Sequence, residues 1–361
     1  MSTAATAAPA LSTSAVELRS ESANRGWINS AVFDLAFFTL SPLSGLALAF
    51  AAQGLHSGHY WVLAAVYLIG IPHYLSSFTF YLGDENRNYY WSRRLAFVAG
   101  PALVFVAVVL LRATHFQEIV FAAMFLWNIY HIAAQSSGIL SLYRRLANGL
   151  AAERPWARHC ILCTNAAMVF WHIERYQTVA GPLARLHPML PRLSGPVFAV
   201  AAIAFLAAYI RLLLQRERLP FPEVAFLGTS LLLFHPYLWL QDYNLATLVT
   251  LMGHFLQYLA IVWLLHRRKY AEGTGSIYQQ ALAWVSRRTS LVLTLCFLVG
   301  CVFLAADLGS HRLGHPLIYI TVWNALTLMH FYVDGLIWQF KQPFVRRTIG
   351  PYLTLESHRW A

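Results

Sequence analysis

Charged residues are scarce in this chain of 361 residues. Asp, Glu, Lys and Arg make up only 11% of it, whereas 58% of the residues are hydrophobic and the mean hydropathy is positive. A soluble globular domain carries about 25% charged residues, so this composition excludes that class. The apolar runs between the charges are long enough to cross a hydrocarbon layer about 30 Å thick. We therefore expect an all-α fold, a polytopic transmembrane helical bundle.

Cysteine is also rare, with four residues: Cys160, Cys163, Cys296 and Cys301. Only the first two have CxxC spacing, and a zinc or redox framework of this kind needs a second matched pair. We interpret the cysteines as buried structural thiols.

The apolar pattern divides the chain into three regions. Residues 1–26 are small and polar and lack the continuous apolar core of a signal peptide, so we predict a disordered cytoplasmic tail. Residues 27–341 are predicted to form a single transmembrane helical domain, and residues 342–361 a cytoplasmic C-terminal tail. About ten spans are expected, near residues 28–52, 59–82, 94–112, 116–142, 158–175, 193–214, 220–240, 243–265, 289–306 and 315–340.

The basic residues predict how these spans are oriented. With the N-terminus in the cytoplasm, ten spans divide the 26 Lys and Arg residues 21 to 5 in favour of the inside. Both termini are therefore predicted to be cytoplasmic, in a multi-pass protein that would lie in the cytoplasmic (inner) membrane of a bacterium. Basic inner loops that meet anionic headgroups account for the net charge of +11, so no nucleic-acid partner is expected.

Six of the fifteen histidines fall inside predicted spans. On four spans that run toward the cytoplasm, the first cytoplasmic cation follows the histidine after 11 to 14 residues, a spread of about 4–5 Å in height at 1.5 Å per residue. We expect these four imidazoles in one layer near the bilayer middle. His172 reaches a comparable depth from the other side, and His235 lies nearer the outer surface. The four histidines of the layer are His73, His131, His254 and His330.

Polar residues recur three or four positions from His131, His254 and His330 on the same helical faces. A polar stripe on an apolar helix must face the bundle interior, because lipid offers it no partner. Imidazole is the commonest side-chain ligand for iron, copper and zinc, and a carboxylate completes an iron site well. The stripes are formed by Asn128, Gln135, Gln257 and Asp334.

The layer is thus predicted to hold a metal ion. The neighbouring Gln, Asn and Ser residues are expected to orient the metal-bound imidazoles from one turn away. Asp334 and Tyr258 are the predicted catalytic residues, with Asp334 either a ligand or a proton acceptor and Tyr258 a proton donor. The predicted ligands are His73, His131, His172, His254, His330 and Asp334, and the predicted orienting residues are Asn128, Gln135 and Gln257.

A metal ion with open positions in an apolar pocket suits the activation of dioxygen against a lipid-soluble substrate. We therefore expect a metal-dependent oxidoreductase of the oxygenase, hydroxylase or desaturase type, with non-haem iron as the first choice of cofactor. Its expected partners are the lipid bilayer, a hydrophobic small-molecule substrate and an electron donor. Haem or copper is possible in place of non-haem iron. Two alternative functions stay open: a haem-binding membrane electron-transfer protein, and a proton-coupled transporter that uses the His and Asp residues.

The clustered HxxxH and HxxHH boxes of membrane desaturases are absent, because no two intramembrane histidines lie within five residues on one helix. Histidines dispersed over separate helices resemble, in general arrangement, the bacterial Brp/Blh carotene-cleaving dioxygenases. This resemblance concerns the arrangement of the histidines and assigns no role to any single residue.

Overall fold

The computed structural model describes residues 26–54, 64–114, 116–147, 153–216, 219–273 and 275–353. Within these ranges the chain is helical and contains no strand, which agrees with the predicted all-α class. Nearly all of the predicted N-terminal tail, and the last eight residues of the predicted C-terminal tail, lie outside the described residues.

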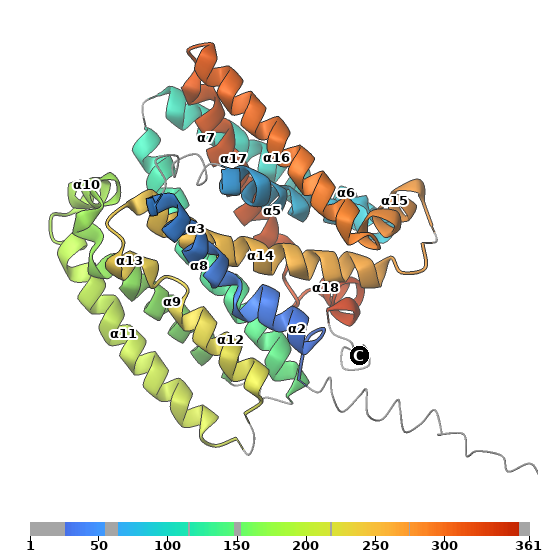
Figure 1. Ribbon diagram of the computed structural model, residues 1–361, viewed down its shortest axis with the longest axis horizontal. Helices are drawn as coiled ribbons and strands as arrows, with labels where there is room; N and C mark the ends of the chain where they lie inside the picture. Colours follow the sequence, from blue (N-terminus) through green and yellow to red (C-terminus); the bar gives the residue numbers. More distant parts are fainter. Residues whose placement is uncertain are drawn as a thin grey trace, which may run out of the picture.

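Helix α14 (Tyr243–Lys269) runs through the middle of the molecule (Figure 1). Its first turn is capped by Asp242, whose carboxylate accepts a hydrogen bond from Leu245 N at 2.9 Å. Helix α3 (Ser41–Gly54) packs directly on it, because Gly45 leaves room for the α14 backbone: a Cβ there would lie 2.4 Å from Val249 O. Small residues of this kind let two membrane helices approach closely.

The other helices flank α14 on two sides (Figure 1). On one side lie α8 (Gln117–Leu146), α9 (Glu153–Trp171), α10 (Gln177–Leu186), α11 (Leu190–Leu213), α12 (Phe221–Leu232) and α13 (Pro236–Trp239). On the other side lie α7 (Gly100–Ala113), α16 (Thr289–Arg312) and α17 (Pro316–Ile337), with α6 (Asp84–Ser92) and α15 (Ile277–Ser286) toward one end. Shorter pieces are α2 (Ala31–Asp34), η1 (Leu35–Thr39), η4 (Leu95–Ala99) and η5 (Ile173–Arg175).

The predicted second span is not one continuous α-helix. It contains a π-helical turn, η2 (Val66–Gly70), then α5 (Ile71–Ser76), then a 3₁₀ segment, η3 (Ser77–Leu82). Pro72, the second residue of α5, has no backbone N–H to donate to the preceding π-helical turn. Changes of helical pitch of this kind occur often at functional sites.

Five of the described helices are long and apolar enough to cross a membrane, and six if one bent pair counts as a span. The bent pair is Ala31–Thr39 with Ser41–Ala51, which meet at 50°. The ten predicted spans are therefore not confirmed, because several of them fold as shorter or bent pieces, and the cytoplasmic placement of both termini stays a prediction. The five helices are Leu95–Ala113, Gln117–Leu146, Leu190–Leu213, Tyr243–Lys269 and Thr289–Arg312.

Part of the predicted C-terminal tail packs against the bundle. Helix α18 (Pro343–Thr348) is followed by the short η6 (Gly350–Tyr352). Val345 on α18, and Ile349 and Leu353 on either side of η6, lie in the same apolar cluster as residues of α14. Cys160 and Cys163 are free and buried on α9, as predicted, whereas Cys296 and Cys301 on α16 are free but only half-buried.

Candidate metal centre

Four histidines from four different elements meet inside the bundle. His73 lies on α5, His131 on α8, His254 on α14 and His330 on α17. Each can offer one ring nitrogen so that the four atoms lie within 4.8 Å of one another. Each imidazole ring contacts two others, and the centroids of contacting rings are 4.5 to 5.1 Å apart.

The four imidazoles are removed from solvent. Their exposed fractions are 0% for His73, 7% for His131, 1% for His254 and 0% for His330. Both ring nitrogens of His73 and His254, and Nε2 of His131 and His330, have no hydrogen-bond partner within the part of the chain that the structure describes. A buried polar group without a hydrogen-bond partner destabilises the folded protein by about 1–3 kcal/mol, and a ligand bound to these nitrogens would remove that destabilisation.

Aromatic side chains enclose the group. The ring of Phe331 stacks on His131 with centroids 4.4 Å apart, and the ring of Phe255 lies 4.7 Å from His73. Gly70, just before α5, makes room for this second contact, since a Cβ there would meet Phe255 Cε2 at 2.8 Å. The local packing therefore brings α5 against α14 and shields the imidazoles from water.

These residues fit a transition-metal ion. Metal–imidazole bonds are about 2.0–2.1 Å long, so ligands on opposite sides of one ion are about 4 Å apart. The 4.8 Å limit on the four nitrogens is within about an ångström of that separation. A buried group of four histidines can thus bind a metal ion, although the geometry alone does not choose among iron, copper and zinc.

Asp334 lies beside the histidine group and is not a member of it. Its Oδ1 accepts hydrogen bonds from Ser77 Oγ at 2.7 Å and from Tyr258 OH at 2.6 Å. Trp338 Nε1 donates to the same tyrosine hydroxyl at 3.3 Å. Ser77 Oγ also lies 2.8 Å from His330 Nδ1, so one hydroxyl joins the carboxylate to an imidazole of the group.

The amide nitrogens of the two glutamines predicted to orient imidazoles bond backbone carbonyls, and their amide oxygens have no hydrogen-bond partner among the described residues. Gln135 Nε2 donates to His254 O at 3.3 Å, and Gln257 Nε2 donates to Phe38 O at 2.9 Å. Gln135 therefore ties α8 to α14, and Gln257 ties α14 to η1. Their hydrogen bonds hold the helices that carry the histidines, and the imidazole rings take no part in them.

Two other residues predicted for the site, Asn128 and His172, make none of the contacts with the four-histidine group described above. Asn128 is half-buried on α8, one turn before His131. His172 is half-buried just after α9, as the residue that precedes η5, and the described structure does not bring it into the four-histidine group. Ser77, four residues after His73, is one of the serines expected from the sequence to orient an imidazole, but the sequence did not mark it as a site residue or indicate that its imidazole is that of His330.

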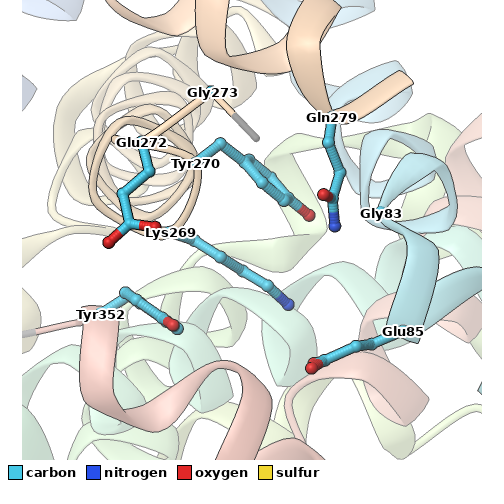
Figure 2. Close-up of a pocket in the computed structure, with 8 residues that line it drawn as sticks. All are labelled: Gly83, Glu85, Lys269, Tyr270, Glu272, Gly273, Gln279 and Tyr352. Atoms are coloured by element: carbon cyan, nitrogen blue, oxygen red, sulfur yellow. The ribbon is translucent and has the colours of Figure 1, made fainter. Parts of the chain in front are cut away.

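A polar cavity of about 190 Å³ lies at the far end of α14 (Figure 2). Lys269 lines it and donates from Nζ to Asn86 Oδ1 at 3.1 Å. Since Lys269 follows His254 by 15 residues, the two lie about 22 Å apart along the helix, so this cavity is not part of the histidine group. Its lining consists of Gly83, Glu85, Lys269, Tyr270, Glu272, Gly273, Gln279 and Tyr352.

No known protein family matches the chain, and no curated protein or solved structure is significantly similar to it.

Proposed function

We propose that the protein is a membrane-bound, metal-dependent oxidoreductase that acts on a hydrophobic substrate, with a non-haem iron ion held by His73, His131, His254 and His330. The observation that carries this proposal is the convergence of four buried imidazoles whose available nitrogens lie within 4.8 Å of one another. Four neutral nitrogen ligands leave room in an octahedral coordination sphere for two further ligands. Iron in such a site supplies the redox chemistry needed to activate dioxygen.

The surroundings of the imidazoles support an apolar substrate. Phe255 and Phe331 flank the rings, and neither side chain is more than 2% exposed. Water is thereby kept from the place where the substrate would react. Tyr258 and Ser77 donate hydrogen bonds to Asp334 Oδ1 at 2.6 and 2.7 Å and so fix this carboxylate beside the group. Asp334 and Tyr258 are the proposed proton-handling residues of the reaction.

Haem is the less favoured cofactor. A porphyrin lies between its two axial imidazoles. Here the ring of His73 is 4.5 Å from that of His330 and 4.7 Å from that of His254, which leaves no room for a macrocycle between them. The transporter is a second candidate because a carboxylate, Asp334, is buried beside the four histidines.

Binding of nitric oxide to the iron(II)-loaded protein tests the proposal without knowledge of the substrate. Nitric oxide takes the position that dioxygen would occupy, and we expect a high-spin iron–nitrosyl signal in electron paramagnetic resonance. The His131→Ala variant, with one ligand removed, is expected to lose most of that signal. A Soret band in the purified protein would instead favour haem.

A wild-type protein that binds iron but gives no nitrosyl signal would contradict an oxygen-activating role. Proton-coupled uptake by metal-free protein in liposomes would favour the transporter.

A further inference from the structure

The hydroxyl of Ser77 lies at the centre of three polar groups that come from two other helices. Its Oγ is 2.8 Å from His330 Nδ1, 2.7 Å from Asp334 Oδ1 and 2.7 Å from Tyr258 OH. Ser77, His330 and Asp334 are at most 5% exposed. A buried side chain with three close polar neighbours has a fixed orientation. Ser77 therefore links the start of η3 to α17 through hydrogen bonds.

The carboxylate of Asp334 can only accept hydrogen bonds, and this sets the direction of the bonds around it. Ser77 and Tyr258 have one hydroxyl proton each, and Ser77 Oγ donates its proton to Asp334 Oδ1. It therefore has no proton left for His330 and can only accept a hydrogen bond from Nδ1. This selects the tautomer of His330 with the proton on Nδ1, and it leaves the lone pair of Nε2 for a metal ion.

A direct bond between His330 and Asp334 is excluded by distance. His330 Nδ1 and Asp334 Oδ1 are 3.8 Å apart, although the two residues are separated by one helical turn. The serine hydroxyl fills this gap. In contrast, His73 and His254 have no hydrogen-bond partner at either ring nitrogen among the described residues. The four imidazoles are therefore not equivalent.

We propose that Ser77 is a positioning residue that couples His330 to Asp334, so that Asp334 acts on the metal ion through Ser77 and the imidazole and does not ligate it. This proposal rests on the proposed metal centre and deepens it. An imidazole whose N–H is directed to a carboxylate is a more basic ligand and stabilises the oxidised metal ion. The hydrogen-bonded chain from Asp334 through Ser77 to His330, called here the coupled arm, thus sets the metal affinity and the reduction potential of the site.

The Ser77→Ala variant tests the coupling. We expect metal affinity to fall about 10- to 100-fold, as for other losses of a group that orients a ligand. The visible spectrum of the cobalt(II)-loaded protein should shift, and the reduction potential of the iron-loaded protein should rise. The matched control is Ser76→Ala, because Ser76 Oγ donates to the carbonyl of His73 at 2.7 Å, within its own helix, and has no other hydrogen bond among the described residues. That variant should keep the wild-type affinity, spectrum and potential.

A double-mutant cycle separates the coupled arm from direct ligation. If Asp334 acts through Ser77, the double variant that combines Ser77→Ala with Asp334→Asn should bind cobalt(II) no more weakly than either single variant. Effects of the two substitutions that add in full would mean that Asp334 ligates the metal directly and would overturn the proposal. If Ser77→Ala does not fold, Asp334→Asn alone carries the test, because a changed cobalt coordination number would show a lost ligand.

The outcomes also distinguish this inference from the proposed function. Wild-type protein that binds no metal contradicts the proposed function. Wild-type protein that binds metal, with Ser77→Ala unchanged in affinity, spectrum and potential, contradicts only the coupling.

Discussion

Helices α14 and α16 are both long and apolar enough to cross a membrane, yet their surroundings are opposite. Of the most apolar 18 residues of each helix, 78% are buried inside the protein in α14 and 11% in α16. The outer helix exposes Leu293, Phe297 and Val302, with more than half of each side chain accessible. The central helix carries His254 and Gln257, both 1% exposed.

This comparison shows that polarity, and not apolarity, marks the inside of this bundle. Lipid is as apolar as leucine, so an exposed apolar face on α16 has no need of protein partners. Imidazole and amide groups find no partner in lipid and must lie where other helices can contact them. The most polar of the apolar segments therefore lie at the centre.

A charge on the outer face of α16 should have the largest effect. Phe297 is 55% exposed near the middle of the helix, where an aspartate in lipid costs about 3 kcal/mol. We expect Phe297→Asp to reduce the fraction of protein inserted into membranes, measured by a membrane-insertion reporter. The Phe297→Leu control should insert as the wild type does. Equal insertion of the aspartate variant would show that this face meets water.

A methyl group at a helix contact should have a smaller effect that depends on the region. In Gly45→Ala the new Cβ would lie 2.4 Å from a carbonyl of α14, so the backbones must separate, at a cost of about 1–3 kcal/mol. In Gly309→Ala on α16 the Cβ would have no described atom within 4 Å, and we expect unchanged or slightly higher stability. Thermal unfolding of both variants in one detergent measures the difference. Equal unfolding temperatures would contradict the close contact of α3 with α14.

The histidine layer could be predicted from the sequence because it depends only on how far each histidine lies along its helix, and so on its depth in the bundle. The spacing from His73, His131, His254 and His330 to the next basic residue gives a common depth, and the structure gathers these four side chains. Height does not say which helices are neighbours around the bundle. His172 shows this limit, since it follows α9, a helix that packs mainly against α11.

Other features depend on local geometry that hydropathy does not encode. The second predicted span changes its helical pitch twice, at η2 and η3, and this directs Ser77 toward α17. The amides of Gln135 and Gln257 lie on the predicted faces, but their partners are backbone carbonyls of other helices. Residue spacing along one helix places a side chain on a face and does not identify the atom opposite it.

Metal content of the purified protein tests the central claim most directly. We expect roughly one transition-metal ion per chain by mass spectrometry, because the four imidazoles converge on one site. His254→Ala and His330→Ala should lose most of it. His235→Ala should keep it, because the His235 imidazole bonds Leu232 O at 2.7 Å and is not a member of the four-histidine group. A wild-type protein without metal, or equal metal content in all three variants, would contradict the account.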